Sequence, residues 1–418
     1  MKSSVDDTLT LKDAVRLSGP VSFNVMLKPA GSQCNMSCRY CYYLDKAGIY
    51  GGREPVMTEQ MLETLVREYI AANEVQDVYF NWHGGEPLLL GLDFYRKALS
   101  YEEKYADGKT LHNTIQTNGL LVNREWAEFF RRHDFLVGIS IDGPREIHDR
   151  YRKDKGGQPT FDRVLRGLEI LRTSEVAFNT MTTVNKASEG HGAEVYRFLK
   201  SLGSRYLQFM PVVEHVKDAR IADPAEEGAQ IAPWSVSAEG FGRFLCDIFD
   251  EWVREDVSQY FVGQFDAALA AWCGVPPGIC VFGETCGGNA VIEHNGDLYP
   301  CDHFVYPKYR LGNIAETPIR ALMGSGPAVR FGIDKRNSLP SSCRQCKWRF
   351  ACNGECPKHR FNRTERGQTG LNTLCKGYKF FFSHIAPYMD YMKTLLLRGL
   401  SPAGVIPWAR LRGREVIS

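Results

Sequence analysis

The sequence predicts an α/β fold with a parallel sheet, followed by a smaller region rich in cysteine. Three observations predict this: six strand-like segments alternate with amphipathic ones over the first 240 residues, motifs directly follow several strands, and eight of the 13 cysteines lie beyond residue 279. Alternating strands and helices favour a parallel sheet, open or closed, with functional residues at the carboxyl ends of its strands. The strands are expected at Ser22–Leu27, Asp77–Asn81, His112–Gln116, Leu136–Ile141, Ala177–Val184 and Tyr206–Pro211.

Amphipathic segments between these strands predict helices. Residues Thr58–Ala71 and Phe161–Arg172 each carry apolar side chains on one face, and Thr58 can cap the first of them. The stretch Glu214–Ser237 is rich in Ala, Glu and Pro and is expected to be a long loop. A helix should follow it, with a buried stripe that runs from Phe241 to Val253.

These patterns divide the chain into four expected parts. They are an N-terminal segment (1–20), the α/β domain (21–240), a linker helix with the cysteine-rich domain (241–385), and a C-terminal helix or tail (386–418). After Tyr391 the chain is mainly basic, so a solvated tail is expected there.

Composition excludes several function classes. The 51 Lys and Arg residues nearly balance the 49 Asp and Glu residues, so no basic excess indicates a nucleic-acid partner. No apolar run approaches the roughly 18 residues of a membrane span, and the N-terminus lacks the apolar core of a signal peptide. A cytoplasmic protein is expected. In such a reducing compartment, 13 cysteines more often bind metal or do chemistry than form disulfides.

The first predicted strand runs into a loop that carries Cys34, Cys38 and Cys41. A structural zinc site needs four closed ligands. On a four-iron cluster, three thiolates leave one iron open to bind a substrate or cofactor. A zinc knuckle completed by a distant residue and an ordinary ferredoxin-type cluster are the alternatives. The spacing, directly after a strand, favours the open cluster.

The second predicted strand runs into Gly84-Gly85-Glu86-Pro87. The two glycines lack side chains, so a ligand can approach their backbone closely. Glu86 can pair with the ammonium group of a ligand. A simple turn is an equally good interpretation of this motif alone.

Eight further cysteines could fully ligate two clusters, which leaves Cys246 and Cys273 over. A zinc ribbon is the alternative, because ligand type alone does not separate zinc from iron–sulfur. The eight are Cys280, Cys286, Cys301, Cys343, Cys346, Cys352, Cys356 and Cys375.

The three-cysteine loop has the form C-x3-C-x-aromatic-C, with Tyr40 as the aromatic residue, and so resembles the radical S-adenosylmethionine (SAM) family. The resemblance implies a partial (β/α)6 barrel, a [4Fe–4S] cluster on the three cysteines, and S-adenosylmethionine on the fourth iron. It also implies a set of residues that contact this cofactor. They are Tyr40, Gly85, Glu86, Ser140, Arg152 and Val213.

The later cysteines look like the SPASM extension of that family. From about Val21 to Phe382 the chain resembles the anaerobic sulfatase-maturating enzymes, most closely at Gln116–Gly119, Ser140–His148, Leu298–Asp302 and Leu311–Ile314. The resemblance implies two auxiliary [4Fe–4S] clusters, hence three clusters in all. One would be held by Cys280, Cys286, Cys301 and Cys356, and the other by Cys343, Cys346, Cys352 and Cys375.

The resemblance also implies an activity. Enzymes of this family oxidise a Cys or Ser side chain of a target sulfatase to Cα-formylglycine. The adenosyl radical removes a Cβ hydrogen, a base removes the thiol or hydroxyl proton, and an auxiliary cluster takes the second electron. Asp302 matches the base, and Tyr43 lies where an aromatic could meet the peptide, with core packing as an equal alternative.

Two kinds of partner are implied: a sulfatase segment of the form Cys/Ser-x-Pro/Ala-x-Arg, and an electron donor such as flavodoxin or ferredoxin. An anionic cluster beside Cys301 is expected to raise the pKa of Asp302 from its ordinary value of about 3.9.

One alternative is a SPASM enzyme that cross-links a ribosomal peptide, although only about 20 residues precede the first strand. Another is a non-catalytic electron carrier or zinc-binding protein.

Overall fold

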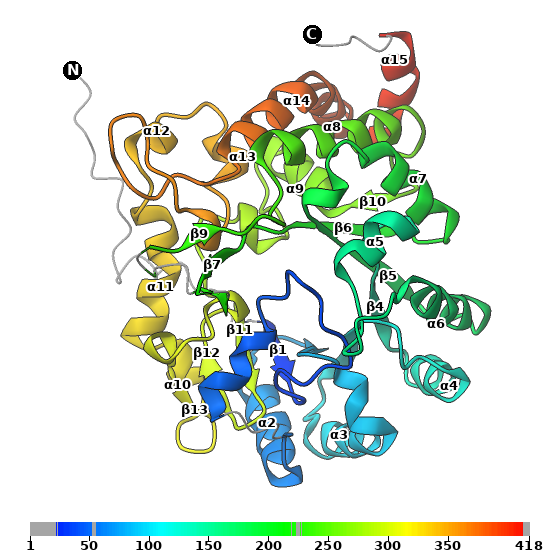
Figure 1. Cartoon of the computed structure of the whole chain (residues 1–418), viewed down its shortest axis with the longest axis vertical. Coiled ribbons are helices and arrows are strands. Elements are labelled where there is room, and N and C mark those ends of the chain that lie inside the picture. The colour runs from blue at the N-terminus through cyan, green and yellow to red at the C-terminus, as the bar shows by residue number, and fades with distance from the viewer. Residues whose placement is uncertain are drawn as a thin grey trace.

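The computed structural model describes residues 22, 24–51, 56–218, 220–222, 226 and 228–412, so the predicted N-terminal segment lies outside the described residues. Its centre is a ten-stranded sheet in the order β10-β6-β5-β4-β3-β2-β1-β11-β12-β13 (Figure 1). Neighbouring strands from β1 to β6 are parallel. These strands are β1 (Asn24–Lys28), β2 (Asp77–Trp82), β3 (Thr110–Thr117), β4 (Leu136–Ser140), β5 (Phe178–Val184) and β6 (Tyr206–Pro211), and β10 (Phe261–Val262) joins β6. The six predicted strands are therefore confirmed.

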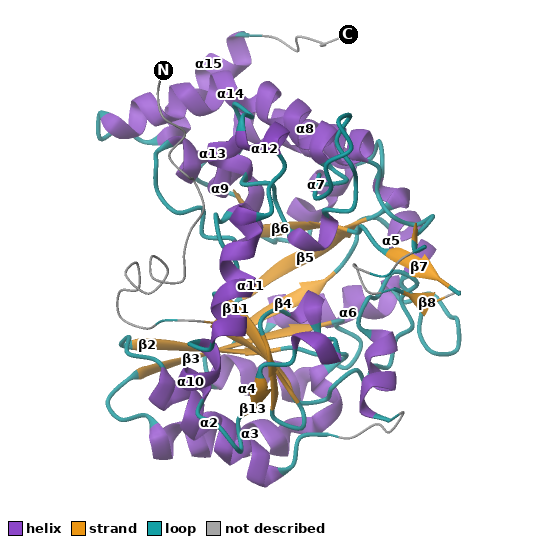
Figure 2. Ribbon diagram, turned by 90° about the vertical axis from the view of Figure 1, so that its left-hand side faces the viewer, coloured by secondary structure: helices purple, strands orange, loops and turns teal. Residues whose placement is uncertain are grey.

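Helices lie outside the curved sheet, around the strands (Figures 1 and 2). The predicted cap is present, because the Thr58 hydroxyl accepts a hydrogen bond from the backbone N–H of Met61. The buried side chains of the first helix, such as Leu65 and Tyr69, pack in the main hydrophobic core. The helices of this part are α2 (Glu59–Ala72), α3 (Gly91–Tyr105), α4 (Arg124–Arg132), α5 (Arg145–Tyr151), α6 (Phe161–Thr173), α7 (Gly192–Ser201), α8 (Ala238–Glu255) and α9 (Gly263–Trp272).

The cysteine-rich region continues the same sheet. Strand β11 (Asn289–Glu293) pairs in parallel with β1, and β12 (Asp297–Tyr299) and β13 (Gly312–Asn313) follow in antiparallel order. The backbone hydrogen bonds between β1 and β11 therefore join the start of the α/β domain to the cysteine-rich region. The helices here are α10 (Ile319–Met323), α11 (Gly326–Asn337), α12 (Ser341–Arg344), α13 (Arg349–Cys352), α14 (Cys375–Leu397) and α15 (Val405–Leu411).

Two expectations about irregular structure are wrong. The stretch expected to be a long loop contains a three-stranded sheet of β7 (His215–Lys217), β8 (Arg220–Ile221) and β9 (Gln230–Ile231). Strands of two or three residues are too short to show an alternating pattern. The expected solvated tail is largely helical, because α14 continues to Leu397 and the ring of Trp408 in α15 stacks on Tyr391 at 4.9 Å.

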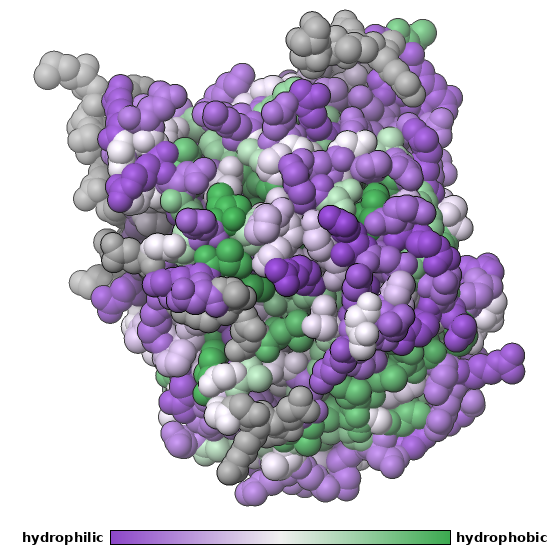
Figure 3. Space-filling model, viewed as in Figure 1, coloured by the Kyte–Doolittle hydropathy of each residue, from purple (hydrophilic) through white to green (hydrophobic). Residues whose placement is uncertain are grey.

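On the face shown in Figure 1, hydrophobic residues are visible in patches left of the centre and toward the lower right, and hydrophilic residues cover much of the rest (Figure 3). Within the described part of the chain, no helix combines the length and apolarity that crossing a bilayer requires.

Candidate functional site

The Gly-Gly-Glu-Pro motif packs its backbone against the three-cysteine loop. The N–H of Gly85 donates to the carbonyl of Gly31 at 2.9 Å, and the N–H of Glu86 donates to the carbonyl of Gln33 at 2.7 Å. A Cβ atom at Gly85 would lie 2.0 Å from the carbonyl oxygen of Gln33. The close contact that requires glycine at this position is therefore made with the three-cysteine loop. The sequence alone predicts that a ligand makes this contact.

Glu86 is fully buried and connects the ends of β2 and β3. Its Oε1 accepts hydrogen bonds from the N–H of Leu88 at 3.1 Å and the hydroxyl of Thr117 at 2.8 Å. Its Oε2 accepts a hydrogen bond from the N–H of Asn118 at 2.8 Å. Burial raises the pKa of Glu86 to about 7 against these hydrogen bonds. Pairing with a ligand ammonium stays a prediction.

Tyr40 is tied to the end of β4 by a buried polar network. Its hydroxyl donates to Asp142 at 2.5 Å and accepts from the guanidinium of Arg152 at 3.1 Å. Arg152 lies 3.7 Å from Asp142, which also accepts a hydrogen bond from the hydroxyl of Thr183 at 2.7 Å. Two of the predicted cofactor contacts, Tyr40 and Arg152, are thus held together by a residue that the sequence reasoning had not singled out.

All thirteen cysteines are free thiols, and eleven of them gather in three sets. Burial raises the pKa of the Cys34 thiol to about 11 and that of the Cys38 thiol to about 12, and neighbouring thiols of the same set contribute to the rise. These thiol–thiol interactions connect residues within a set. The sets are Cys34, Cys38 and Cys41; Cys280, Cys286, Cys301 and Cys356; and Cys343, Cys346, Cys352 and Cys375.

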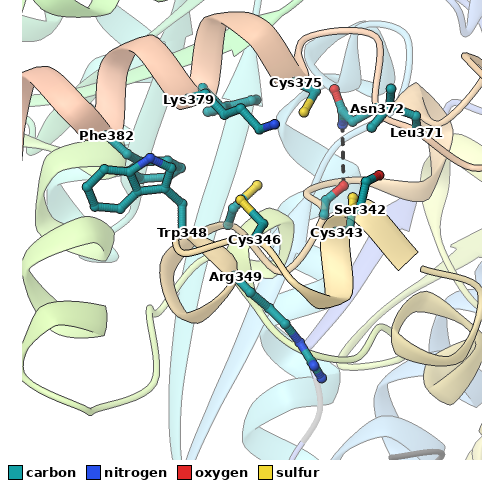
Figure 4. A pocket seen from close by; sticks show the side chains of 13 residues that line it. Ser342, Cys343, Cys346, Trp348, Arg349, Leu371, Asn372, Cys375, Lys379 and Phe382 are labelled. Atoms are coloured by element: carbon teal, nitrogen blue, oxygen red, sulfur yellow. Dashed lines mark hydrogen bonds between the residues drawn. The ribbon is translucent and has the colours of Figure 1, made fainter. Parts of the chain in front are cut away.

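The third set surrounds a cavity. The side chains of Cys343, Cys346 and Cys375 point into it, and Trp348 and Phe382 close one side (Figure 4). The fourth cysteine of the set also lines this cavity. Thiolates brought together in a buried space repel one another unless a cation is shared among them, and cluster irons supply such cations. The donor atoms in all three sets therefore fit iron–sulfur clusters.

Asp302 lies between the first two sets. It follows Cys301 in the chain, and it accepts a hydrogen bond from the hydroxyl of Tyr42, which follows Cys41. Burial raises the pKa of Asp302, but His303, the ammonium of Lys28 and the Tyr42 hydrogen bond outweigh it. The polypeptide alone therefore holds this pKa below its ordinary value. The sequence predicts that the negative charge of a cluster raises the pKa of Asp302. The protein's own groups act in the opposite direction and lower it.

Three other predicted residues have contrasting surroundings. The hydroxyl of Ser140, at the end of β4, accepts a hydrogen bond from the side-chain amide of Gln116 at 2.9 Å. Val213 is buried in the main core. Tyr43 is buried, and its hydroxyl donates to Glu293. These surroundings are the ones expected if Tyr43 packs in the core. Their roles toward cofactor or peptide stay predictions.

Sequence reasoning missed four residues of this site: Lys28, Tyr42, Asp142 and Glu293. Lys28 and Glu293 each end an apolar strand, and both are fully buried. A charged residue at the carboxyl end of such a strand was a usable signal, because buried charges are rare unless they are paired. The contact of Tyr42 with Asp302 had no local signal, because 260 positions separate the two residues.

A model of the Radical SAM superfamily matches residues 29–199, and a model of the SPASM iron–sulfur cluster-binding domain matches residues 280–347. The chain is also 48% identical over 389 residues to the serine-type anaerobic sulfatase-maturating enzyme of Bacteroides thetaiotaomicron. This match covers 91% of the chain and 94% of that relative. The chain belongs to the anaerobic sulfatase-maturating enzymes. As a member of this family, it is a radical SAM enzyme, and the predicted family is confirmed.

Other proteins that are similar to this chain agree with this assignment. The cysteine-type enzyme of Clostridium novyi is 34% identical, over 90% of this chain and 99% of the relative. The solved structure of native anSMEcpe with bound AdoMet and Cp18Cys peptide matches with a TM-score of 0.78 at 30% identity, covering 90% of this chain and 99% of that one. The predicted partial barrel with a SPASM domain is thereby confirmed. Streptococcus suis SuiB with bound S-adenosylmethionine is 15% identical with a TM-score of 0.58 and shares the fold alone.

Proposed function

We propose that this enzyme oxidises a serine side chain of a sulfatase to Cα-formylglycine. The observation that carries the proposal is the position of Asp302 between two sets of buried thiols. Asp302 follows Cys301 in the chain and accepts a hydrogen bond from Tyr42, the residue after Cys41. Serine as the target is supported by the relatives. Identity is 48% to a serine-type enzyme and 34% to a cysteine-type enzyme, each over most of the chain.

The cofactor sites follow from the three thiol sets. The set at Cys34 would hold the cluster that binds S-adenosylmethionine, and the other two sets would hold the auxiliary [4Fe–4S] clusters. When bound, these groups supply the radical that removes a hydrogen atom from Cβ and accept the electron that the oxidation releases. The contacts with S-adenosylmethionine are assigned to Tyr40, Gly85, Glu86, Ser140, Arg152 and Val213.

Asp302 is the proton acceptor in this proposal. An Asp of ordinary pKa is already a carboxylate at neutral pH. The groups that lower the pKa of Asp302 keep it ionised but make it a weaker base, so it should accept the hydroxyl proton of the substrate only after the Cβ hydrogen has been removed. The hydrogen bond from Tyr42 fixes the direction of the carboxylate, and the ammonium of Lys28 adds a favourable charge. The chain's own residues thus hold the base in its reactive form before a substrate arrives.

Two partners belong to this proposal. The first is an extended sulfatase segment of the form Cys/Ser-x-Pro/Ala-x-Arg, and the second is a one-electron donor such as flavodoxin or ferredoxin. The thirteen free thiols suit a reducing compartment, which supports a location in the cytoplasm.

The test is anaerobic incubation of the purified enzyme with a reductant, S-adenosylmethionine and matched sulfatase peptides that differ only in Ser, Cys or Ala at the target position. Mass spectrometry should detect a loss of two hydrogens from the Ser peptide and no change in the Ala peptide. Conversion of the Cys peptide alone would overturn the serine assignment, and no aldehyde on either peptide would overturn the function. Iron and sulfide contents of about twelve each would support three clusters.

A further inference from the structure

Lys28 is an anomaly in the core of the protein. It is the last residue of β1, it is completely buried, and its ammonium has no hydrogen-bond partner among the described residues. Burying an ammonium without compensation costs several kcal/mol. Buried charges are therefore rare unless nearby groups of opposite charge compensate for them.

Two side chains pack against this ammonium. The ring of Tyr43 lies below it, with 3.9 Å between Nζ and the ring centroid. Glu293 is the residue that faces Lys28 across the parallel ladder between β1 and β11. The hydroxyl of Tyr43 donates to Oε1 of Glu293, while Oε2 has no hydrogen-bond partner in the described part of the chain. Lys28, Tyr43 and Glu293 therefore form one buried polar trio.

The trio connects the first two cysteine sets. Tyr43 lies two positions after Cys41, and the strand that ends at Glu293 leads through β12 to Cys301. Burial lowers the pKa of Lys28, and the negative charges of Asp302, Glu293 and the two cysteines, Cys41 and Cys301, act against this by favouring the ammonium form. A single positive charge thus faces sulfur ligands that belong to two different sets.

We propose that Lys28 is the counter-charge shared by the clusters at Cys41 and Cys301, and that it raises the reduction potential of both. The inference rests on the proposed function, because it assumes clusters at these sets. Each cluster becomes more negative when it takes up an electron, so a fixed positive charge nearby favours the reduced form. Exclusion of water makes the effect stronger than it would be at the surface.

Glu293 provides a test with the opposite sign. Its carboxylate partly offsets the charge of Lys28, so removing it should leave the ammonium more effective. A lost positive charge should move the potentials down, and a lost negative charge should move them up. Damage to packing would not produce shifts of opposite sign at the same cluster. Lys28 is accordingly a positioning residue, which acts through the clusters and through Asp302 and does not touch the substrate itself.

The experiment is an anaerobic redox titration of the loaded full-length enzyme, monitored by electron paramagnetic resonance. The N-terminal cluster is followed by its spectral response to S-adenosylmethionine. The auxiliary cluster is followed in a background where Cys34, Cys38 and Cys41 are replaced by Ala. Lys28→Met should shift both potentials negative, Glu293→Gln should shift them positive, and Lys28→Arg should stay near the parent. Lys104→Met, which alters an exposed ion pair on α3, is the matched control.

An unchanged potential in Lys28→Met, or shifts of the same sign in Lys28→Met and Glu293→Gln, would overturn the inference. Should Lys28→Met fail to load its clusters, Glu293→Gln decides alone, since the absence of a positive shift there contradicts the shared counter-charge. Iron and sulfide analysis separates the two proposals. A protein without clusters defeats the proposed function, whereas a loaded protein with unmoved potentials defeats only the role of Lys28.

Discussion

The hydroxyl of Tyr42 donates a hydrogen bond to Asp302, although 260 positions separate the two residues in the sequence. Tyr42 belongs to the loop of the first cysteine set and Asp302 to the segment of the second. The ring of His303 packs edge-on against Tyr42 at 4.8 Å, and the ammonium of Lys358 lies 4.3 Å from its centroid. This contact joins the two regions of the chain at the point where the proposed base is located.

Replacing the base should separate the two halves of the reaction. We expect Asp302→Asn to cleave S-adenosylmethionine but to form formylglycine at least about 100-fold more slowly, because the amide cannot accept the substrate proton. Liquid chromatography with mass spectrometry can quantify 5′-deoxyadenosine and the peptide aldehyde in one sample. A variant with unchanged aldehyde formation would remove Asp302 from the mechanism.

Tyr42→Phe should weaken the same step to a smaller extent. Loss of a hydrogen bond to a buried carboxylate costs about 1.5–3 kcal/mol, so aldehyde formation should fall about tenfold or more while 5′-deoxyadenosine is still released. Tyr206→Phe is the control, because this residue, at the start of β6, is 55% exposed. Equal activity in both variants would show that the hydroxyl of Tyr42 does not orient the base.

Asp142→Asn should weaken S-adenosylmethionine binding. The change removes the negative charge that compensates buried Arg152 and disturbs the hydrogen bond that holds Tyr40. Breaking a buried ion pair costs about 3–5 kcal/mol, and we expect part of this to appear as at least a tenfold loss of cofactor affinity.

Anaerobic calorimetry can measure that affinity. Asp162→Asn is the matched control, because it breaks the exposed pair with Arg145, for which little effect is expected. If Asp142→Asn bound S-adenosylmethionine as tightly as the parent does, the network around Tyr40 would be unimportant for the cofactor.

Gly85→Ala should disturb the three-cysteine loop. The added methyl group would collide with the carbonyl oxygen of Gln33, at 2.0 Å, and that atom belongs to the backbone and cannot rotate away. We expect the loop to move and the iron content to fall by about one cluster. In Gly48→Ala the new methyl group meets nothing within 4 Å, so this control should keep its iron. Colorimetric iron analysis of both variants decides the outcome.

Glu102 makes the protein less stable at alkaline pH. Burial raises its pKa to about 8 from 4.5, against a hydrogen bond of 2.7 Å from Asn113. Because the protonated carboxyl is favoured in the folded state, the contribution of Glu102 to stability is largest at low pH. It falls as the pH rises from about 4.5 to 8, by at most about 1.4 kcal/mol per pH unit.

Glu102→Gln keeps an acceptor for Asn113 and removes this titration. It should raise the melting temperature at pH 8 and change it little at pH 5. Glu103→Gln, an exposed neighbour in α3, should change neither value. Parallel melting curves of Glu102→Gln and the parent across this range would contradict the prediction.

The central strands and helices could be predicted because their patterns are local. The alternation in Asp77–Trp82 and the helical stripe of Glu59–Ala72 are each visible within a dozen residues. The small sheet around His215–Lys217 is too short for such a pattern. The pairing of β1 with β11 joins segments more than 260 positions apart, so no periodicity could indicate it.

The residues of the candidate site also differ in whether local sequence patterns could predict them. The cysteines and the Gly-Gly-Glu-Pro motif are visible as short patterns, whereas the trio of Lys28, Tyr43 and Glu293 depends on strand register. The role of glycine at Gly85 also needed the structure, because the atom that excludes a side chain belongs to the loop that packs on it.

The parallel ladder between β1 and β11 has a consequence for the way such chains can be cut or recombined. Five residue pairs, from Asn24 with Asn289 to Lys28 with Glu293, connect the two strands. A fragment that ended before β11 would leave the edge of β1 bare, and bare edges recruit foreign strands and promote aggregation. A shuffled gene would have to inherit both strands together, so we expect them to be exchanged as one module.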